Sequence, residues 1–122
     1  QRDLIVLDVT MKLAAGDQKI IDDRMSELAV ARRTKQPLEY PSAGSTFKRP
    51  EGYFAGKLIM DAGLRGYRVG DAQVSEKHCG FVVNRGNATA DDVIKLIDDV
   101  KAKVSEEYDV VLEPEVRMIG EF

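Results

Sequence analysis

TADDVIKLIDDVKAKVSE, residues 89–106, carries the clearest periodic pattern in the chain and decides its fold class. Its apolar residues recur at helical spacing on one face, opposite a charged face: Val93, Leu96, Ile97, Val100 and Val104. Thr89 precedes this stripe as an N-cap, and Asp92 stands where the second half of a capping box is needed. An apolar stripe of this kind is buried against another layer, so we predict a helix that packs on a sheet.

Two further helices are expected before this one. The first starts at a cap, Asp17, and carries apolar residues at i, i+4 and i+7: Ile21, Met25 and Leu28. It should end before Pro37, because the residue preceding a proline is pushed out of the helical region. The second is short, with one apolar face made by Leu58, Ile59 and Ala62. Gly63 and Leu64 follow it and fit a left-handed C-cap with its hydrophobic contact.

Short apolar runs predict the strands. Residues 4–13 (LIVLDVTMKL) show a two-residue period at Val9, Met11 and Leu13. Two more short strands are expected at residues 67–74 and 80–83, joined by a charged turn. Pro114 favours an edge strand in the apolar segments on either side of it, residues 108–112 and 116–119.

The order of these elements defines the expected architecture. Residues 37–52 hold three Pro and two Gly and sustain no regular period, so we expect a loop, and loops of this length are often functional. The order is then strand, helix, loop, helix, two strands, helix, strand. It predicts an α+β fold, a single sheet with helices packed on it. A chain of 122 residues has the size of one domain, so residues 1–122 are expected to form a single unit.

Composition limits the classes of function. A net charge of -3 offers no broad positive field, so we expect no nucleic-acid partner. No segment has the apolar length of a signal peptide or membrane span, and the one cysteine, Cys79, cannot form a disulfide within the chain. We therefore expect a cytoplasmic protein without a membrane partner. The strand-like residues 4–13 follow almost no polar lead-in, as in a domain cut from a longer protein.

Several chemistries lack the residues that they need. No two glycines have the G-x-G spacing, which excludes the dinucleotide fingerprint and the glycine-rich phosphate loop. One His and one Cys cannot supply a protein-only zinc site, so we expect no metal. A Ser-His-Asp triad through His78 is formally open, but no nucleophile elbow accompanies it.

Two segments carry a more specific signal. They are residues 32–50 (RRTKQPLEYPSAGSTFKRP) and residues 112–120 (LEPEVRMIG), with residues 55–93 (AGKLIMDAGLRGYRVGDAQVSEKHCGFVVNRGNATADDV) between them. Together they resemble the C-terminal, substrate-binding domain of the UDP-N-acetylenolpyruvylglucosamine reductase (MurB) family. The resemblance spans nearly the whole chain and is weakest near its start.

The resemblance implies a fold and an activity. The fold is the α+β C-terminal domain of that family. Its whole enzymes are flavoprotein oxidoreductases of peptidoglycan synthesis, in which NADPH reduces FAD and the flavin then reduces UDP-N-acetylenolpyruvylglucosamine to UDP-N-acetylmuramate. The N-terminal FAD-binding region is absent from this chain, so we expect it to bind no FAD alone and to be inactive alone. A stand-alone nucleotide-sugar binding module without redox chemistry is the alternative.

The resemblance also assigns two catalytic residues. The proton donor is the serine that closes the Ser-Ala-Gly-Ser string, Ser45, and its acidic partner is the glutamate of Pro-Glu-Val-Arg, Glu115. Hydride addition at C3 leaves negative charge at C2, so the site needs a positioned proton donor and groups that stabilise the charge. An arginine of the preceding domain contributes in the family and lies outside this chain. Without the matching strings, Ser45 is a turn residue and Glu115 a solvated carboxylate. Together, they are expected to converge on one cleft.

Three residues are expected to bind the substrate. Lys35 matches a family lysine that contacts the UDP part. It belongs to a basic cluster that can hold a diphosphate, or that is an ordinary solvated face: Arg32, Arg33, Lys35, Lys48 and Arg49. Arg49 stands where some relatives have a substrate-contacting Asn, and His78 where others have a substrate-contacting Gln. Cys79 replaces the usual Ala and is expected to be a small buried hydrophobe.

Overall fold

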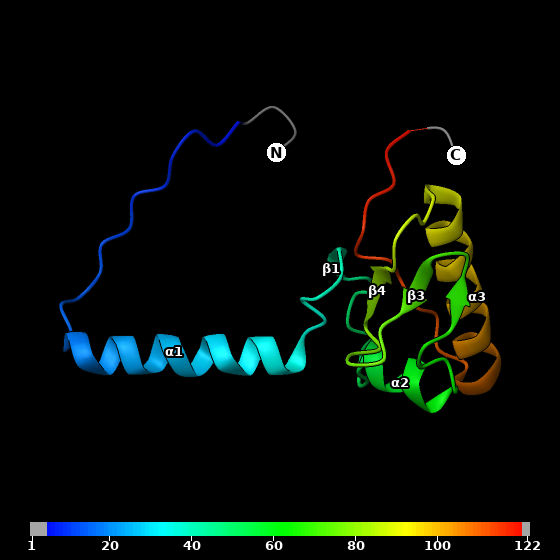
Figure 1. The fold of residues 1–122 in the computed structure, drawn as a ribbon, viewed down its shortest axis with the longest axis horizontal. Helices are drawn as coiled ribbons and strands as arrows, with labels where there is room; N and C mark the ends of the chain where they lie inside the picture. Colours follow the sequence, from blue (N-terminus) through cyan, green and yellow to red (C-terminus); the bar gives the residue numbers. More distant parts are fainter. Residues whose placement is uncertain (1–4, 121–122) are drawn as a thin grey trace. The chain divides into compact units, whose positions relative to one another are not determined.

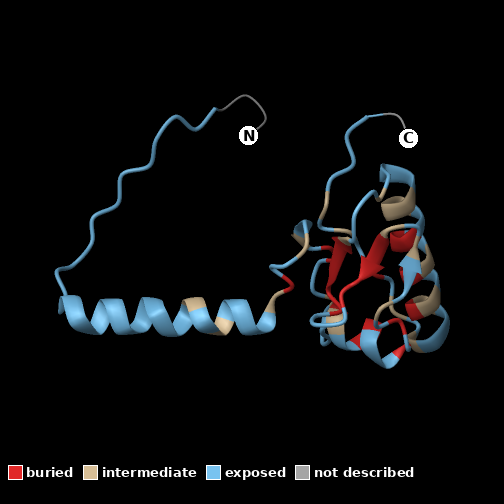
Figure 2. Cartoon of the chain, in the orientation of Figure 1, coloured by how far each residue is buried: buried red, intermediate tan, exposed pale blue. Residues whose placement is uncertain are grey.

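The chain divides into two compact units, which are described here one at a time. The structure is a computed structural model that describes residues 5–120. Its units are Gln1–Ala31 and Arg32–Phe122. Figure 1 draws the elements, and Figure 2 shows that the buried residues lie in the second unit.

A four-stranded antiparallel sheet forms the centre of the second unit, which confirms the predicted α+β fold with a single sheet. The strand order is β1-β4-β3-β2, and the strands are β1 (Ser42–Ser45), β2 (Arg68–Val69), β3 (Ala72–Val74) and β4 (Phe81–Asn84). The strand expected at residues 67–74 is a hairpin of β2 and β3 that turns at Gly70 and Asp71. The one expected at residues 80–83 corresponds to β4.

Two helices flank this sheet and agree with their predictions. They are α2 (Ala55–Asp61) and α3 (Ala90–Tyr108), and α3 packs against α2, β2 and β3. Thr89 and Asp92 form the expected capping box, with the Asp92 N–H donating to Thr89 Oγ1 at 3.1 Å and the Thr89 N–H to Asp92 Oδ2 at 2.9 Å. Gly63 has a φ of 74° and donates to the Met60 carbonyl, which confirms the left-handed C-cap after α2.

The core of the second unit joins both helices to the sheet. Of the predicted α3 stripe, Val93 is only half-buried, whereas the other four residues are at most 1% exposed. Their partners come from α2, β3, β4 and the segments around them. The cluster consists of Phe47, Ala55, Leu58, Ile59, Ala62, Leu64, Ala72, Val74, Cys79, Val82, Leu96, Ile97, Val100, Val104 and Leu112. The expectation that Cys79 is a small buried hydrophobe agrees with its 6% exposure.

The segment after α3 does not form the predicted edge strand. A single antiparallel bridge joins Phe47 to Pro114, and no strand is found in the described residues that follow α3. The Lys48 N–H donates to the Glu113 carbonyl at 2.9 Å, and the Glu115 N–H to the Thr46 carbonyl at 2.8 Å. Pro114 occupies the non-hydrogen-bonded position of this bridge, where no N–H is needed. The pairing does not extend past Glu115, because the Thr46 N–H already donates to the Gly80 carbonyl.

The first unit contains the chief error of the sequence-based prediction. No strand forms in the described part of residues 4–13, and Leu4 lies outside the described residues. A strand needs a neighbouring strand to pair its backbone groups, and the described chain offers none for this segment. The helix α1 (Gln18–Lys35) begins after Asp17, whose Oδ1 accepts from the Ile20 N–H at 3.0 Å. It ends before Pro37, as predicted.

The apolar face expected on α1 is present but not buried. Ile21, Met25 and Leu28 are 42%, 65% and 52% exposed, and α1 contains no buried residue. The last turn of α1 belongs to the second unit and carries Arg32, Arg33 and Lys35. The helix-forming pattern was therefore identified correctly, whereas the burial that we expected of it is absent from the structure.

Candidate functional site

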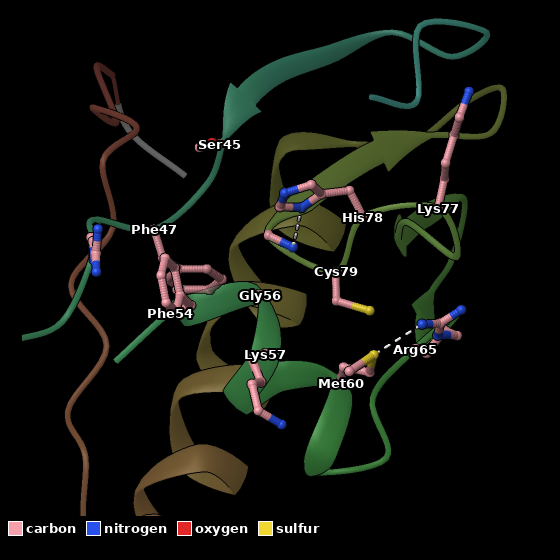
Figure 3. A pocket seen from close by; sticks show the side chains of 13 residues that line it. Ser45, Phe47, Phe54, Gly56, Lys57, Met60, Arg65, Lys77, His78 and Cys79 are labelled. Atoms are coloured by element: carbon pink, nitrogen blue, oxygen red, sulfur yellow. Dashed lines mark hydrogen bonds between the residues drawn. The ribbon is translucent and has the colours of Figure 1, made fainter. Parts of the chain in front are cut away.

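A cleft in the second unit gathers several of the residues singled out in the sequence. Its volume is about 410 Å³. Three segments line it: the end of β1 and the residues after it, α2 with its flanks, and the turn before β4. Its lining residues are Ser45, Phe47, Arg49, Phe54, Ala55, Gly56, Lys57, Met60, Arg65, Lys77, His78, Cys79 and Gly80. Figure 3 shows their side chains around this space.

Ser45 stands at the end of β1 and lines the cleft with an exposed side chain. β1 pairs irregularly with β4, where Gly44 between the paired Ser42 and Ser45 has a φ of 84°. Immediately beyond, the Thr46 N–H donates to the Gly80 carbonyl at 2.8 Å, and Thr46 Oγ1 accepts from the Val82 N–H at 3.0 Å. Thr46 is 3% exposed, so this buried anchor fixes the position of Ser45.

Glu115 lies beside the cleft strand but does not line the cleft. Its N–H donates to the carbonyl of Thr46, the residue next to Ser45 in the chain. The Glu115 side chain is exposed. The backbones at Ser45 and Glu115 thus lie side by side, although about seventy residues separate them in the sequence. The expected convergence of their side chains on one cleft stays a prediction.

Arg49 and His78 line the cleft, and Lys35 does not. The Arg49 guanidinium lies 4.1 Å from the centre of the Phe54 ring, and its Nε donates to the Tyr53 carbonyl at 3.3 Å. A stacked arginine keeps its charge available at the rim of the cleft. Lys35 is the exposed last residue of α1.

The basic cluster expected from the sequence is only partly present at the cleft. Lys48 pairs with Glu113 at 2.8 Å, and Arg32 Nε bonds the Gln36 amide oxygen at 3.1 Å. Neither of these two cations lines the cleft. Arg49 is joined there instead by three basic residues that the sequence did not reveal: Lys57, Arg65 and Lys77.

These additional cations differ in how well they are paired. Lys57 Nζ lies 2.6 Å from Asp61 Oδ2, and this hydrogen bond raises the pKa of Lys57. Lys77 Nζ lies 3.4 Å from Glu39 Oε2. Arg65 Nη2 contacts Met60 Sδ at 2.9 Å and also faces the thiol of Cys79. Burial raises the pKa of that thiol, so it is not a reactive thiolate. No carboxylate is found among the described residues that line the cleft, so the lining itself carries a net positive charge, which Asp61 and Glu39 partly offset from outside it.

The family to which these residues belong is identified by comparison. The profile of one family matches residues 36–119, the part of the chain that builds the sheet, both of its helices and the cleft. The family is described as UDP-N-acetylenolpyruvoylglucosamine reductase, C-terminal domain. The chain belongs to this family.

Individual members of the reductase family are similar over nearly the whole chain. A UDP-N-acetylenolpyruvoylglucosamine reductase of Lachnoclostridium phytofermentans is 70% identical over 95% of this chain and 37% of its own length. One of Agathobacter rectalis is 65% identical over 100% of this chain and 39% of its own length. The crystal structure of the reductase (MurB) from Thermus caldophilus has a TM-score of 0.71 and 42% identity, covering 87% of this chain and 37% of that one. The chain thus spans less than half the length of these relatives.

The cations of this reductase-family domain show what sequence patterns miss. Lys57 lies in the first turn of α2, Arg65 lies in the segment between α2 and β2, and Lys77 lies in the turn before β4. Nothing in their spacing along the sequence distinguishes them from other surface cations. Within residues 5–120 the structure has no cluster of three or more His, Cys, Asp or Glu that could hold a metal ion. No helix in that range is long and apolar enough to cross a bilayer.

Proposed function

We propose that this chain is the C-terminal, substrate-binding part of a longer UDP-N-acetylenolpyruvoylglucosamine reductase. The longer protein reduces UDP-N-acetylenolpyruvoylglucosamine to UDP-N-acetylmuramate with NADPH and FAD, in the cytoplasm, as a step of peptidoglycan synthesis. The observation that carries this proposal is the coincidence of the family match with the residues that form the cleft. FAD and NADPH are proposed to bind to the longer protein and not to this chain alone, as the resemblance implies.

Ser45 donates the proton that completes the reduction. Reduced flavin, when bound, supplies the hydride to C3, and negative charge then develops at C2 of the substrate. Ser45 lines the cleft and is exposed, so a proton at its Oγ can reach an atom bound there. The cations that line the cleft favour negative charge on the substrate and on the serine oxygen. Glu115, whose N–H bonds the residue next to Ser45, is proposed as the acidic partner, hydrogen-bonded so that its carboxyl does not oppose the developing charge.

The substrate's diphosphate is held by basic side chains. Lys35 is proposed as one contact, as the resemblance implies, and Arg49 as another. His78 is proposed to contact the substrate at the position where other members have a substrate-contacting Gln. Arg49 and His78 line the same cleft as Ser45, which supports their assignment. A guanidinium suits a phosphate because it can donate two parallel hydrogen bonds to it.

The substitution Ser45→Ala in the longer protein tests this proposal. Reduction of the bound flavin by NADPH should continue at the parent rate, while reoxidation of the flavin by the enolpyruvyl substrate falls by about two orders of magnitude or more. Stopped-flow absorbance of the flavin separates the two half-reactions. Ser42→Ala is the matched control, because Ser42 belongs to the same strand but does not line the cleft. Near-normal turnover by Ser45→Ala would contradict the assignment.

A stand-alone nucleotide-sugar binding module is the second candidate. It is supported by one observation: the residues of the cleft and its cations all belong to the second unit. Titration of the isolated chain with UDP-N-acetylglucosamine and, separately, with FAD distinguishes the two. We expect at most weak binding of the nucleotide sugar and none of FAD. Tight binding of the nucleotide sugar would favour the module, and tight, stoichiometric FAD binding would contradict our placement of the flavin.

We also propose that the remainder of the longer protein packs on the first unit. Ten large apolar side chains between residues 5 and 28 are 42–91% exposed: Ile5, Val6, Leu7, Val9, Met11, Leu13, Ile20, Ile21, Met25 and Leu28. Proteins rarely leave so much apolar surface in contact with water. The relatives are more than twice as long as this chain, so they have a further part large enough to cover this surface.

Charged substitutions in the longer protein test this packing. Leu7→Asp places a carboxylate where we expect a buried contact, so the yield of FAD-loaded protein should fall clearly below that of the parent. Val111→Asp is the control, because Val111 is 73% exposed in the second unit and should remain in water. The yield is measured from flavin absorbance per mole of protein. Parent-like loading of Leu7→Asp would show that the surface is not covered.

A further inference from the structure

The imidazole of His78 has one nitrogen already engaged inside the protein. The N–H of Gly80 donates a hydrogen bond to His78 Nδ1 at 3.1 Å. A nitrogen that accepts a hydrogen bond cannot carry a proton itself. In the neutral ring the proton must therefore be on Nε2, which makes that nitrogen a donor and not an acceptor.

The ring is held in this orientation by its neighbours. The rings of His78 and Phe81 pack in a T-shaped arrangement, with their centroids 5.0 Å apart and an interplanar angle of 71°. A Cβ added at Gly56 would lie 3.1 Å from the Gly80 nitrogen and 3.3 Å from His78 Cε1. One added at Gly80 would lie 3.0 Å from the same ring carbon. The absence of side chains at these two glycines is therefore what leaves room for the ring and its hydrogen bond.

The main chain that carries His78 is fixed as well. Ser75, which is 2% exposed, accepts hydrogen bonds at its Oγ from the N–H groups of Lys77 and His78, both at 3.2 Å. Lys77 Nζ donates to the Arg33 carbonyl at 2.8 Å. The Phe81 N–H donates to the His78 carbonyl at 3.0 Å, which closes the turn. A turn bonded at so many points positions the ring before any ligand arrives.

The ring lies on the same wall of the cleft as Ser45. Ser45 pairs with Phe81 in the sheet, and both Ser45 and His78 line the cleft. Figure 3 shows the His78 ring between the side chains of Ser45 and Cys79, with the dashed bond leaving one ring nitrogen. The other nitrogen, Nε2, has no hydrogen-bond partner among the described residues.

We propose that His78 acts as a neutral hydrogen-bond donor, whose Nε2–H binds an acceptor oxygen of the ligand beside Ser45, and that Gly56, Gly80 and Ser75 are the residues that position it. The ligand group is a carbonyl, carboxylate or phosphate oxygen. His78 is then not the base that removes a proton from Ser45, because a base would need a free electron pair on Nε2. The Ser-His-Asp triad that the sequence left open would need His78 as a base, and we propose that His78 is a hydrogen-bond donor instead. The identity of the ligand rests on the proposed function, whereas the position of the proton does not.

Nuclear magnetic resonance reads the position of the proton directly. His78 is the single histidine of the chain, so a long-range ¹H–¹⁵N correlation spectrum of the labelled chain contains one imidazole pattern. We expect a protonated Nε2 and an unprotonated Nδ1 in the neutral ring. Gly56→Ala should displace the ring and yield a mixture of the two neutral forms. A proton on Nδ1 in the parent chain would overturn the proposal. The same spectrum of the longer protein, with the signal assigned by its loss in His78→Gln, provides a second measurement.

Kinetics of the longer protein test the donor role separately. His78→Leu should raise the KM for the enolpyruvyl substrate by about tenfold or more, because a hydrogen bond to a charged oxygen is lost. His78→Gln should recover most of that loss, since its amide N–H is a donor of similar reach but cannot act as a base. Equal losses in both variants would overturn the donor role. A parent protein that fails to reduce the substrate at all would contradict the proposed function and leave the spectroscopic result standing.

Discussion

The helices α1 and α3 are nearly equal in length and both have apolar residues at helical spacing, though more weakly on α1, yet one is exposed and the other buried. Ile21, Met25 and Leu28 on α1 are 42–65% exposed. The apolar residues of α3 pack against α2 and the sheet, and four of them are at most 1% exposed. Periodicity in a sequence therefore specifies which face of a helix is apolar, but burial requires a partner surface that the helix's own sequence does not contain.

The largest expected effect comes from truncating matched leucines on the two helices. Leu96→Ala should lower the free energy of unfolding by about 3 kcal/mol, because Leu96 is 0% exposed and its removal leaves a cavity. Leu28→Ala should change it by less than about 0.5 kcal/mol, because Leu28 is 52% exposed. Urea unfolding of the isolated chain followed by circular dichroism measures both. Equal losses would mean that α1 is packed in solution.

A smaller difference is expected between the two helix caps. Thr89→Ala removes half of the capping box on α3 and should lower the free energy of unfolding by about 1 kcal/mol. Asp17→Ala removes the cap on α1 and should lower the helical content without moving the cooperative unfolding midpoint. The helical signal before the transition and the midpoint itself report the two effects. A shift of the midpoint by Asp17→Ala would show that α1 unfolds together with the second unit.

The smallest effect is expected from the exposed ion pair of Lys48 and Glu113. The hydrogen bond from Lys48 holds the pKa of Glu113 below its ordinary value of 4.5. A pKa lowered by folding adds stability above pH 4.5, and that stability is lost as the pH falls through the lowered value. The melting temperature of the parent should fall as the pH is lowered from about 5 to about 3, and that of Glu113→Gln should fall slightly less.

The matched control for this ion pair lies on α1. Lys19 and Asp23 form an exposed pair at 2.7 Å in the first unit, so Asp23→Asn should leave the melting temperature of the second unit unchanged at every pH. Exposed pairs are screened by solvent, so the difference between Glu113→Gln and the parent at about pH 7 should itself be slight. A large loss at that pH would show that the bridge from Phe47 to Pro114 depends on this pair.

Local signals in the sequence predicted the helices well and the strands less well. The cap at Thr89 and the left-handed Gly63 define helix ends through neighbouring residues, so both could be identified. β1 was missed because Ser-Ala-Gly-Ser contains no β-branched or aromatic residue, and its pairing with β4 joins residues far apart in the sequence. The strand expected at residues 4–13 failed for the opposite reason, since the pattern is present but no strand within residues 5–120 pairs with it.

The site shows the same limit. Ser45, Arg49 and His78, carried over from a family resemblance, all line the cleft. Lys35 and Glu115, carried over in the same way, do not line it, although Glu115 bonds the neighbouring strand. The basic residues that sequence reasoning missed come from separate segments, and only the folded chain brings them to one cleft. Residue types can be read in a sequence, but convergence depends on tertiary contacts.

The hydrogen bonds between residues 46–48 and residues 113–115 can form only late in synthesis on the ribosome. A ribosome that adds about 5–20 residues per second needs on the order of several seconds to pass from one segment to the other. Throughout that interval the carbonyl of Thr46 and the N–H of Lys48 lack the partners that they have in the folded chain. A nascent chain can thus build its sheet and still leave the strand that carries Ser45 open on one side, accessible to chaperones, until Glu115 has emerged.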